Sequence, residues 1–341
     1  MSGPLIIGIN GLSLDSSTQA QLLHPAIGGV ILFSRNYDDL EQLRQLTEQI
    51  RSLDRPRLVL MVDQEGGAVQ RFQQQFTRLP PLAALGRWYT SHPHRALDMA
   101  YRHARVMAAE VLAAGLDMSL APVLDLQGIS EVIGSRAFSS DPDAVFDLAG
   151  HYLAGMRDAG MASCGKHFPG HGSVQADSHH QQVTDSRTST EIERDIEPFR
   201  RLLAQLDSLM PAHVCYQQVD KEPAGFSEVW LNDVLRRDMS YQGIIISDDL
   251  DMAGASTAGE PLQRLQACLN AGCDLALVCA PESVAKLLSS LDDSGLQLPD
   301  CSNLIERLYG RPSFSLEEQL LVPEFRSWRE SLNALAEQSH G

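Results

Sequence analysis

Residues 58–65 read Leu-Val-Leu-Met-Val-Asp-Gln-Glu, a short apolar run that ends abruptly in polar and charged residues. Consecutive apolar residues over this length are typical of a strand that is buried on both faces of a parallel sheet. Seven further runs of similar length occur at residues 5–9, 28–33, 118–124, 162–167, 208–214, 243–248 and 274–280. The sequence therefore predicts eight strands in a parallel arrangement.

Stretches with helical periodicity separate these runs. They cover residues 38–53, 94–114 and 142–159, and two more helices are expected to begin at the capping residues Thr190 and Ser227. Strands that alternate with helices predict an α/β fold with a parallel sheet. Eight such units favour a closed (β/α)8, TIM-like barrel over two Rossmann halves, because no GxGxxG motif follows the first strand.

The sequence predicts a single catalytic domain over residues 1–341. No break in composition marks a domain boundary, and we expect the barrel to span about residues 5–310. Residues 315–341 have the pattern of one or two amphipathic helices, which we expect to pack outside the barrel. Residues 73–93, with three consecutive glutamines and a Pro-Pro pair, are interpreted as a loop.

The composition excludes several classes of protein. Of the 341 residues, 43% are hydrophobic and 21% are charged, a globular mixture and not a disordered one. The formal net charge is −17 and no basic run occurs, so we expect no nucleic acid as a partner. No stretch approaches the roughly 20 apolar residues of a membrane span. We expect no signal peptide, because residues 1–7 show neither a basic region nor a long apolar region. The six cysteines form no CxxC pair and are expected to be reduced and mostly buried, as in a cytoplasmic protein.

Polar side chains follow at least five of the predicted strands. These residues are Asp63, Asp125, the Lys166-His167 pair, His213 and Asp248. In (β/α)8 enzymes the carboxyl ends of the strands carry the active site. We therefore expect these residues to surround one site.

Residues 166–180 carry four histidines, one lysine and one aspartate, and two chemistries compete for them. Histidine and aspartate are good zinc ligands, but the histidine spacing matches no known ligand motif and the Lys166 charge would repel a cation. The alternative is acid–base catalysis, since Asp177 stands two residues before His179 and can orient its ring. We favour this second reading and expect no metal ion.

Two further clusters contain carboxylates. Asp248 closes a predicted strand and can serve as a nucleophile, a base or a metal ligand, whereas Asp249 and Asp251 are expected to cap the next helix or loop. Asp63 and Arg71 flank a Glu-Gly-Gly turn, and together they could bind the vicinal hydroxyls of a sugar or form a structural ion pair.

Several motifs resemble those of the family 3 glycoside hydrolases, and in particular the bacterial cytoplasmic β-N-acetylglucosaminidases of cell-wall recycling. The resemblance covers nearly the whole chain up to about residue 310. It rests on Asp63-Gln64-Glu65-Gly66-Gly67, Gln70-Arg71, Ile133-Gly134-Ser135-Arg136, Gly165-Lys166-His167-Phe168-Pro169-Gly170-His171-Gly172, Asp177-Ser178-His179, Met210-Pro211-Ala212-His213 and Ser247-Asp248-Asp249-Leu250. The chain departs from the usual family residues at Ala68, Ala137 and Asp251.

The resemblance implies a retaining hydrolase that removes terminal N-acetylglucosamine from 1,6-anhydro-N-acetylmuramyl peptides. It implies that Asp248 is the nucleophile and that His179, held by Asp177, is the general acid/base. The residues that it implies for binding the sugar are Asp63, Arg71, Arg136, Lys166 and His167. We expect no cofactor, and we expect a cytoplasmic monomer with a small glycan as its partner.

Three alternatives remain open from the sequence. A phosphorylase could use the same scaffold, because a histidine acid/base does not repel phosphate as a carboxylate would. A metal-dependent barrel hydrolase and a sugar-binding protein without catalytic activity are the others. We also expect the glycine-bearing segment 162–182 to be mobile and to bring His179 over the bound sugar.

Overall fold

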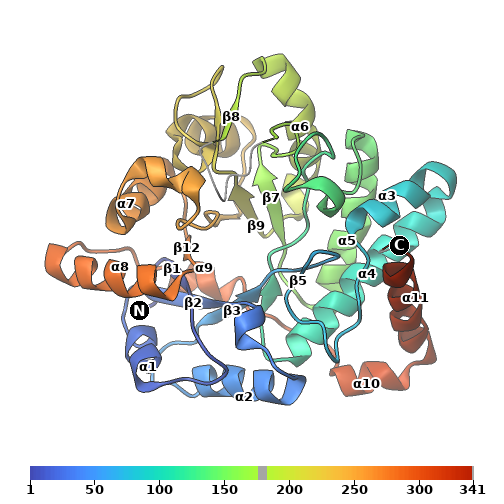
Figure 1. Cartoon of the computed structure of the whole chain (residues 1–341), viewed down its shortest axis with the longest axis horizontal. Coiled ribbons are helices and arrows are strands. Elements are labelled where there is room, and N and C mark those ends of the chain that lie inside the picture. The colour runs from blue at the N-terminus through green and yellow to red at the C-terminus, as the bar shows by residue number, and fades with distance from the viewer. Residues whose placement is uncertain (176–182, 340–341) are drawn as a thin grey trace.

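The computed structural model describes residues 1–175 and 183–339, and its strands form two parallel sheets (Figure 1). The larger sheet has the order β12-β1-β2-β3-β6, and the smaller has the order β11-β9-β7. Each strand overlaps one of the eight predicted runs, so the parallel α/β prediction is confirmed. The bounds are β1 Leu5–Gly8, β2 Ile27–Leu32, β3 Val59–Val62, β6 Met118–Ser119, β7 Cys164–Phe168, β9 Ser208–Pro211, β11 Ile244–Ile245 and β12 Ala276–Val278.

Isolated parallel bridges link the ends of the two sheets. Val123, which follows β6, pairs with Lys166 of β7. Ile246, which follows β11, pairs with Leu275, which precedes β12. The carboxyl ends of strands from both sheets therefore point the same way, and the residues after them can share one site.

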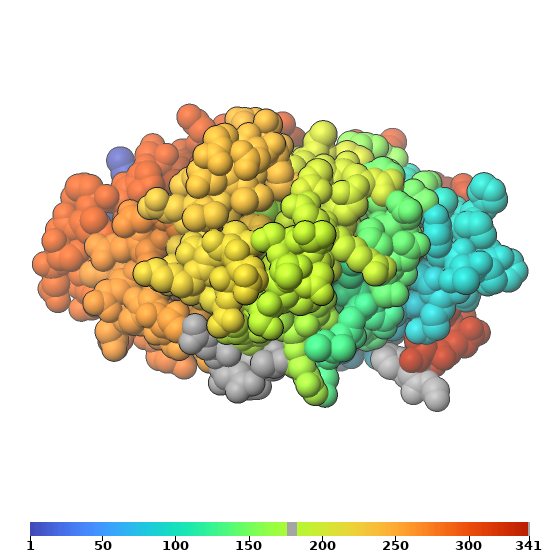
Figure 2. Space-filling model, turned by 90° about the horizontal axis from the view of Figure 1, so that it is seen from above, coloured from blue at the N-terminus to red at the C-terminus, as the bar shows by residue number. Residues whose placement is uncertain are grey.

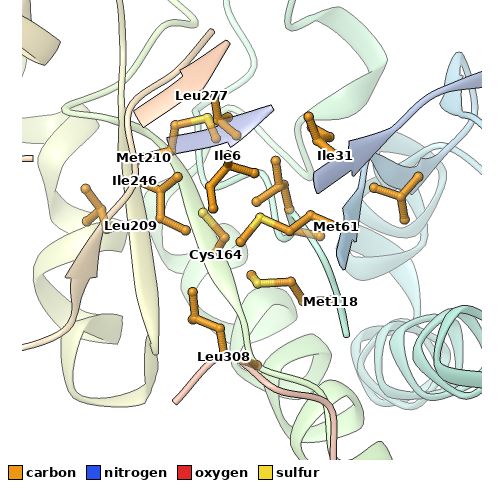
Figure 3. Packing of buried hydrophobic residues seen from close by; sticks show 14 of the residues in the cluster. Ile6, Ile31, Met61, Met118, Cys164, Leu209, Met210, Ile246, Leu277 and Leu308 are labelled. Atoms are coloured by element: carbon orange, nitrogen blue, oxygen red, sulfur yellow. The ribbon is translucent and has the colours of Figure 1, made fainter. Parts of the chain in front are cut away.

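The strands meet in an apolar interior (Figure 3). Ile6, Met61, Cys164, Leu209 and Leu277 come from five different strands, and each is at most 2% exposed. Figure 3 shows these side chains converging from both sheets. This shared core fixes the sheets relative to each other, because burial of apolar side chains is the dominant favourable contribution to folding.

The helices follow the predicted positions with three corrections. Asp39 and Asp141 cap helices α2 and α5 as their sequences indicate. Helix α6 begins after Thr188 and not at Thr190, because Thr188 forms a reciprocal capping box with Glu191. The bounds are α1 Ser16–Leu22, α2 Leu40–Arg51, α3 Leu82–Ser91, α4 Pro93–Ala113, α5 Pro142–Ala159, α6 Ser189–Leu202, α7 Pro261–Ala271, α8 Pro281–Ser294, α9 Ser302–Glu306, α10 Leu316–Leu321 and α11 Pro323–Ser339.

The interpretation of residues 73–93 as a loop holds for residues 73–81, which contain no helix or strand, and is wrong for the rest, because α3 occupies residues 82–91. Leu82 and Leu85 are buried and anchor this helix despite the preceding Pro-Pro pair. The prediction for Ser227 holds in part: its hydroxyl accepts a hydrogen bond from the Trp230 N–H, but the helix that follows is a π-helical segment, Val229–Asp238.

The C-terminal helices lie where the sequence places them, and α11 packs against α4 (Figure 1). Arg329 of α11 forms an ion pair with buried Glu110 of α4 and donates a hydrogen bond to the Thr77 hydroxyl. Asn333 accepts a hydrogen bond from the Arg78 N–H. Helix α11 therefore holds the segment that follows Arg71.

Two short strand pairs lie outside the main sheets. Strands β4 (Gln64–Gly66) and β5 (Val69–Gln70) form an antiparallel hairpin, and β8 (Val183–Asp185) pairs with β10 (Val214–Tyr216). The hairpin turn contains Gly66 and Gly67, both at positive φ, and a Cβ on either would lie 2.8 Å from an atom of Pro80 or Pro81. Glycine is therefore required in this turn, which carries the chain from Asp63 to Arg71.

The molecule is wider than it is tall when turned by 90°, with α7 and α8 at one end and α3 at the other (Figure 2). In the described ranges, no helix combines the length and the apolar character needed to cross a membrane. All six cysteines lie in those ranges as free thiols, and only Cys279 is not fully buried, in agreement with the sequence.

Candidate active site

A cavity of about 820 Å³ opens at the carboxyl ends of the strands. Six of the eight residues predicted for the site line it, and they come from segments far apart in the sequence. These residues are Asp63, Arg71, Arg136, Lys166, His167 and Asp248. The structure thus brings together all the predicted site residues that lie within the described ranges.

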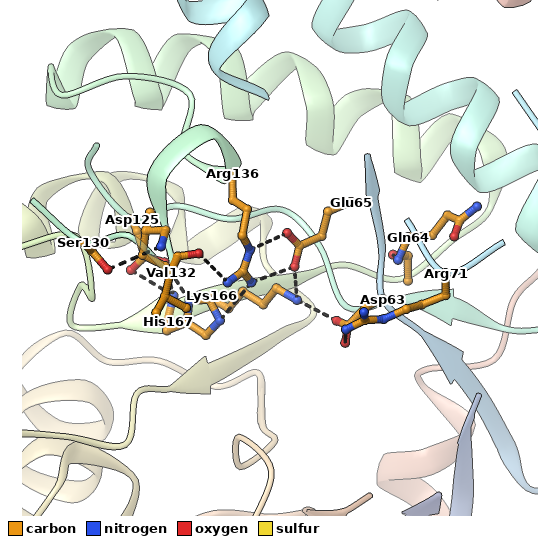
Figure 4. Close-up of polar contacts among 12 residues, drawn as sticks. Asp63, Gln64, Glu65, Arg71, Asp125, Ser130, Val132, Arg136, Lys166 and His167 are labelled. Atoms are coloured by element: carbon orange, nitrogen blue, oxygen red, sulfur yellow. Dashed lines mark hydrogen bonds and ion pairs between the residues drawn. The ribbon is translucent and has the colours of Figure 1, made fainter. Parts of the chain in front are cut away.

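Lys166 occupies the floor of the cavity between two carboxylates (Figure 4). Its Nζ lies 2.7 Å from Asp63 Oδ1 and 2.6 Å from Glu65 Oε1, and its side chain is 3% exposed. Burial alone would lower the pKa of Lys166, but Asp63 and Glu65 together raise it above the ordinary value. The ammonium group therefore stays charged and can donate a hydrogen bond to a ligand in the cavity.

Arg136 is held by the same glutamate. Its Nε lies 2.8 Å from Glu65 Oε2 and its Nη2 lies 2.9 Å from Oε1, a bidentate pair (Figure 4). Burial alone would raise the pKa of Glu65, but Arg136 and Lys166 hold it well below its usual range. Glu65 is thus a buried anion that fixes two cations at the edge of the cavity.

His167 is oriented by Asp125, which lies beneath it. The Asp125 carboxylate lies 2.6 Å from His167 Nδ1 and also accepts a hydrogen bond from the His171 N–H at 2.7 Å. Burial opposes ionisation of Asp125, yet His167 and these hydrogen bonds keep its pKa below the ordinary value. This partnership leaves the other ring nitrogen, Nε2, on the side of Arg136 and the cavity.

Arg71 and Asp63 lie on opposite arms of the hairpin turn. Arg71 Nη2 lies 3.6 Å from Asp63 Oδ2, and its guanidinium lies 5.6 Å from the centre of the Phe33 ring. Both side chains remain partly exposed, at 31% and 17%. A cation and a carboxylate that share a cavity wall can each bind a hydroxyl group of a sugar.

Asp248 follows β11 and faces the cavity from the smaller sheet. Its Oδ1 accepts a hydrogen bond from the Asp249 N–H at 2.8 Å. Asp249 accepts hydrogen bonds from the N–H groups of Asp251 and Cys279, and Asp251 accepts one from Ala280 N. The sequence predicts that Asp249 and Asp251 cap the next helix or loop. Asp249 accepts the Asp251 N–H within the loop, in agreement with this prediction, whereas neither residue is the N-cap of the helix that follows and Asp251 binds Ala280 N after β12.

The three departures from the family pattern lie at different depths. Ala68 is exposed and lines the cavity, so a small side chain leaves space beside Arg71. Ala137 is fully buried behind Arg136. Asp251 bonds the backbone as described above and does not line the cavity.

Asp177 and His179 lie outside the described residues, as does most of the later part of the segment predicted to be mobile. The last described residue before them, Gln175, lines the cavity. In the parts of the chain that are described, no group of three or more His, Cys, Asp or Glu side chains is arranged to hold a metal ion.

Sequence reasoning gave no role to Glu65 and no partner to Asp125. Both are buried anions that contact the cavity residues from behind. Their positions after strands were visible in the sequence, but their partners are 42 or more residues away and depend on the register between strands. His213, also predicted at a strand end, is buried and stacks on Phe226 at 5.1 Å, and burial lowers its pKa.

Comparisons with known proteins give a consistent result. Residues 7–309 match the family described as "Glycosyl hydrolase family 3 N terminal domain". A beta-hexosaminidase of Nitrosospira multiformis is 49% identical over 316 residues, which cover 91% of this chain and 90% of that protein. The crystal structure of native NagZ from Neisseria gonorrhoeae is 41% identical, with a TM-score of 0.90 and 98% of each chain covered. The structure of that NagZ in complex with N-trifluoroacetyl-D-glucosamine is also 41% identical, with a TM-score of 0.91 and the same coverage of both chains.

Proposed function

Since this chain belongs to glycosyl hydrolase family 3 and is a glycoside hydrolase of the beta-hexosaminidase type, we propose that it is a retaining exo-β-N-acetylglucosaminidase. The observation that carries the proposal is the position of Asp248. It shares one cavity with a cluster of hydrogen-bonding groups suited to a sugar, which are Asp63, Arg71, Arg136, Lys166 and His167. A carboxylate beside a sugar-sized site is the arrangement that glycoside hydrolysis requires.

The proposed sugar is a terminal, β-linked N-acetylglucosamine. Support comes from the related NagZ that was crystallised with N-trifluoroacetyl-D-glucosamine, an N-acylated glucosamine. Asp63 would accept hydrogen bonds from ring hydroxyls, while Arg71, Lys166 and His167 would donate them. Paired donors and acceptors of this kind select hydroxyl groups by geometry, because each unsatisfied buried partner would cost binding free energy.

The proposed natural substrate is N-acetylglucosamine linked to 1,6-anhydro-N-acetylmuramyl peptide, in cell-wall recycling in the cytoplasm. The cavity of about 820 Å³ is near the upper end of the usual range of about 300–1,000 Å³ for small-molecule sites. It therefore has room for the sugar and for part of a leaving group. We propose that the enzyme acts as a monomer and needs no cofactor.

The proposed mechanism is a double displacement. Asp248 attacks the anomeric carbon, and the bond from that carbon to the leaving oxygen breaks as His179 donates a proton to this oxygen. The sugar is then bonded to Asp248 through an ester. His179 takes a proton from water, the water oxygen attacks the anomeric carbon, and the sugar leaves with its original configuration.

His179 is proposed from its sequence neighbourhood. Asp177 would hold the imidazole and favour its protonated form. The described chain reaches Gln175 at the cavity before this segment and continues after it with β8, which pairs with β10. Imidazole has a reference pKa of about 6.5 and can therefore give and take a proton near neutral pH.

We also propose that the two parallel sheets close into one (β/α)8 barrel, in a single catalytic domain. The bridges from Val123 to Lys166 and from Ile246 to Leu275 support closure, since they lie at the two seams between the sheets. In a barrel, the residues after all the strands surround one mouth.

The test is the release of 4-nitrophenol from 4-nitrophenyl N-acetyl-β-glucosaminide in phosphate-free buffer with a chelator. Wild type should release nitrophenol, Asp248→Ala should be nearly inactive, and proton NMR should show the β-anomer of the product first. Asp292→Ala is the matched control, because Asp292 is exposed on α8, far from the cavity residues in sequence and contact. Activity that requires phosphate, or that returns only with zinc, would replace the proposal with a phosphorylase or a metal-dependent hydrolase.

The natural leaving group needs a separate comparison. Two disaccharides should be offered, one with a 1,6-anhydro ring on the muramyl residue and one with a free reducing end. A higher kcat/KM for the anhydro form would support the proposed substrate, and equal values would contradict it.

A further inference from the structure

Asp249, which follows the proposed nucleophile, holds the loop together with its side chain and its main chain. Its carboxylate accepts two backbone hydrogen bonds, from Asp251 N at 3.0 Å and from Cys279 N at 3.1 Å, both through Oδ1. Its own N–H donates to Asp248 Oδ1 at 2.8 Å. The same residue therefore anchors the loop and touches the carboxylate of Asp248.

The anchor lies on the carboxyl end of β12. Further hydrogen bonds run alongside it, from Leu250 N to Leu277 O at 2.9 Å and from Ala280 N to Asp251 Oδ2 at 2.8 Å. Cys279 O in turn accepts a hydrogen bond from Arg35 Nη2 at 2.8 Å. The Asp249 carboxylate thus connects the carboxyl end of β12, at Cys279, to the backbone next to Asp248.

From these contacts we propose that Asp249 is a positioning residue, which sets the orientation of the Asp248 carboxylate by tying its backbone to β12. The proposal rests on the proposed role of Asp248 as nucleophile. A carboxylate must meet the anomeric carbon along the line of the breaking bond, so a displacement of about 1 Å can cost on the order of 100-fold in rate. The sugar-binding candidates Lys166 and His167 lie in β7, and their ion pairs are with Asp63 and Asp125 and not with Asp249.

The chemistry of the site suggests a conservative replacement. Burial, together with the negative charges of Asp251 and Asp248, raises the pKa of Asp249 to about 7. Both the neutral and the ionised form present an oxygen to the two N–H groups. Asparagine keeps one oxygen, which can accept both hydrogen bonds because both use Oδ1, and it replaces the charged second oxygen by a neutral NH2 group. Alanine leaves both N–H groups without their acceptor.

The experiment measures kcat and KM of Asp249→Asn and Asp249→Ala with 4-nitrophenyl N-acetyl-β-glucosaminide and with an alkyl glycoside that leaves less readily. Asp249→Ala should lower kcat by about 100-fold on both substrates, with KM changed by less than about threefold. Asp249→Asn should recover most of the lost kcat. Asp292→Asn, a carboxylate-to-amide change on the exposed surface of α8 and outside this loop, is the matched control and should stay within about threefold of wild type.

Three results would overturn the proposal. The first is a kcat of Asp249→Ala within about threefold of wild type. The second is a loss confined to the poor leaving group, which would make Asp249 the acid/base instead. The third is an Asp249→Asn variant as impaired as Asp249→Ala. If Asp249→Ala does not fold, Asp249→Glu is measured instead. Its longer side chain keeps the hydrogen-bond acceptor but displaces the loop, so kcat should fall while KM stays unchanged.

A separate arm tests the premise. Asp248→Gly should be rescued by azide and yield the α-glycosyl azide, since azide can replace the missing nucleophile on the same face of the sugar. Absence of this product in an Asp248→Gly enzyme that remains active would contradict the role of Asp248. The kinetics of the Asp249 variants are interpreted only after the azide experiment. A wrong role for Asp248 and a wrong role for Asp249 can therefore be told apart.

Discussion

Lys166 and Glu65 form an ion pair of 2.6 Å in which both side chains are only 3% exposed. Glu65 also binds Arg136 through two hydrogen bonds, so one buried carboxylate pairs with two cations at the cavity, of which Lys166 is also paired with Asp63. Charges in such an environment are costly to leave unpaired. The position of two sugar-binding candidates therefore depends on a residue that does not itself line the cavity.

Glu65→Gln should destabilise the fold and weaken substrate binding together. Loss of one partner of a buried pair costs about 3 kcal/mol, so the free energy of unfolding at pH 7 should fall by about that amount. KM should rise by about tenfold, because Lys166 and Arg136 lose their common anchor. Because Glu65 has a depressed pKa in the folded state, its contribution is present above about pH 4.3 and is lost as the pH falls further.

The control for this variant is Asp117→Asn. Asp117 is a buried carboxylate at the amino end of β6, which binds Arg51 and Arg57 and accepts from the N–H groups of Leu60 and Gly310. Asp117→Asn should lower the midpoint of urea unfolding without a change in KM. If both variants raise KM equally, the rise in KM of Glu65→Gln results from general destabilisation of the fold and not from the loss of an anchor for Lys166 and Arg136.

Asp125→Asn should affect the substrate complex through His167. The amide replaces one acceptor by a donor, which cannot serve both the His167 N–H groups and His171 N. We expect KM to increase about tenfold, with a smaller change in kcat, and a loss of about 2 kcal/mol in stability. Titration with N-acetylglucosamine as a product inhibitor, followed by calorimetry, measures the binding change directly; unaltered inhibitor affinity would disprove an orienting role for Asp125.

His179→Ala should lower kcat/KM most for substrates whose leaving group must be protonated before it departs. An alkyl glycoside needs protonation of its leaving oxygen, and we expect a loss of about 1,000-fold in kcat/KM. A 2,4-dinitrophenyl glycoside needs little, and the loss should be about tenfold or less. Equal losses on both substrates would exclude the acid role, and Asp177→Asn should show the same trend with a smaller amplitude.

His103 predicts a specific dependence of stability on pH. It is fully buried in α4 with its Nε2 3.0 Å from Pro80 O, and burial lowers its pKa to about 4. The unfolded chain therefore binds this proton more tightly, so stability falls as the pH decreases from about 6.5 towards about 4. Between pH 6.5 and pH 5 the loss should be about 2 kcal/mol. Chemical denaturation across this range should show a shallower slope for His103→Gln, and an unchanged slope would refute the assignment.

The positions of the strands along the chain and the residues at their carboxyl ends could be predicted from the sequence because both are local patterns. Val59–Val62 is apolar throughout and Asp63 follows it, so strand and site residue are visible in one short stretch. Helix α3 was missed because its capping residue, Pro81, makes no side-chain hydrogen bond, while the preceding Pro-Pro pair is typical of loops. Tertiary burial of Leu82 and Leu85 decides that segment, and burial is not a local property.

The partners of the site residues could not be predicted for a related reason. The contact of Lys166 with Asp63 spans 103 residues, and that of Arg136 with Glu65 spans 71. Each depends on strand register and on the hairpin turn at Gly66-Gly67, in which the neighbouring backbone excludes a Cβ. The motifs predicted the residues that line the cavity, whereas only the structure shows that Glu65 binds Lys166 and Arg136 and that Asp125 binds His167.

The segment after Arg71 is bound by α11, which is one of the last parts of the chain to be synthesised. Thr77 and Arg329 are separated by 252 residues, and ribosomes add about 5–20 residues per second. For some tens of seconds after Glu110 has emerged, the nascent chain carries this carboxylate without the guanidinium that neutralises it. Thr77 can bind Glu110 as soon as α4 has been made, whereas the contacts of this segment with α11 can form only when synthesis is almost complete.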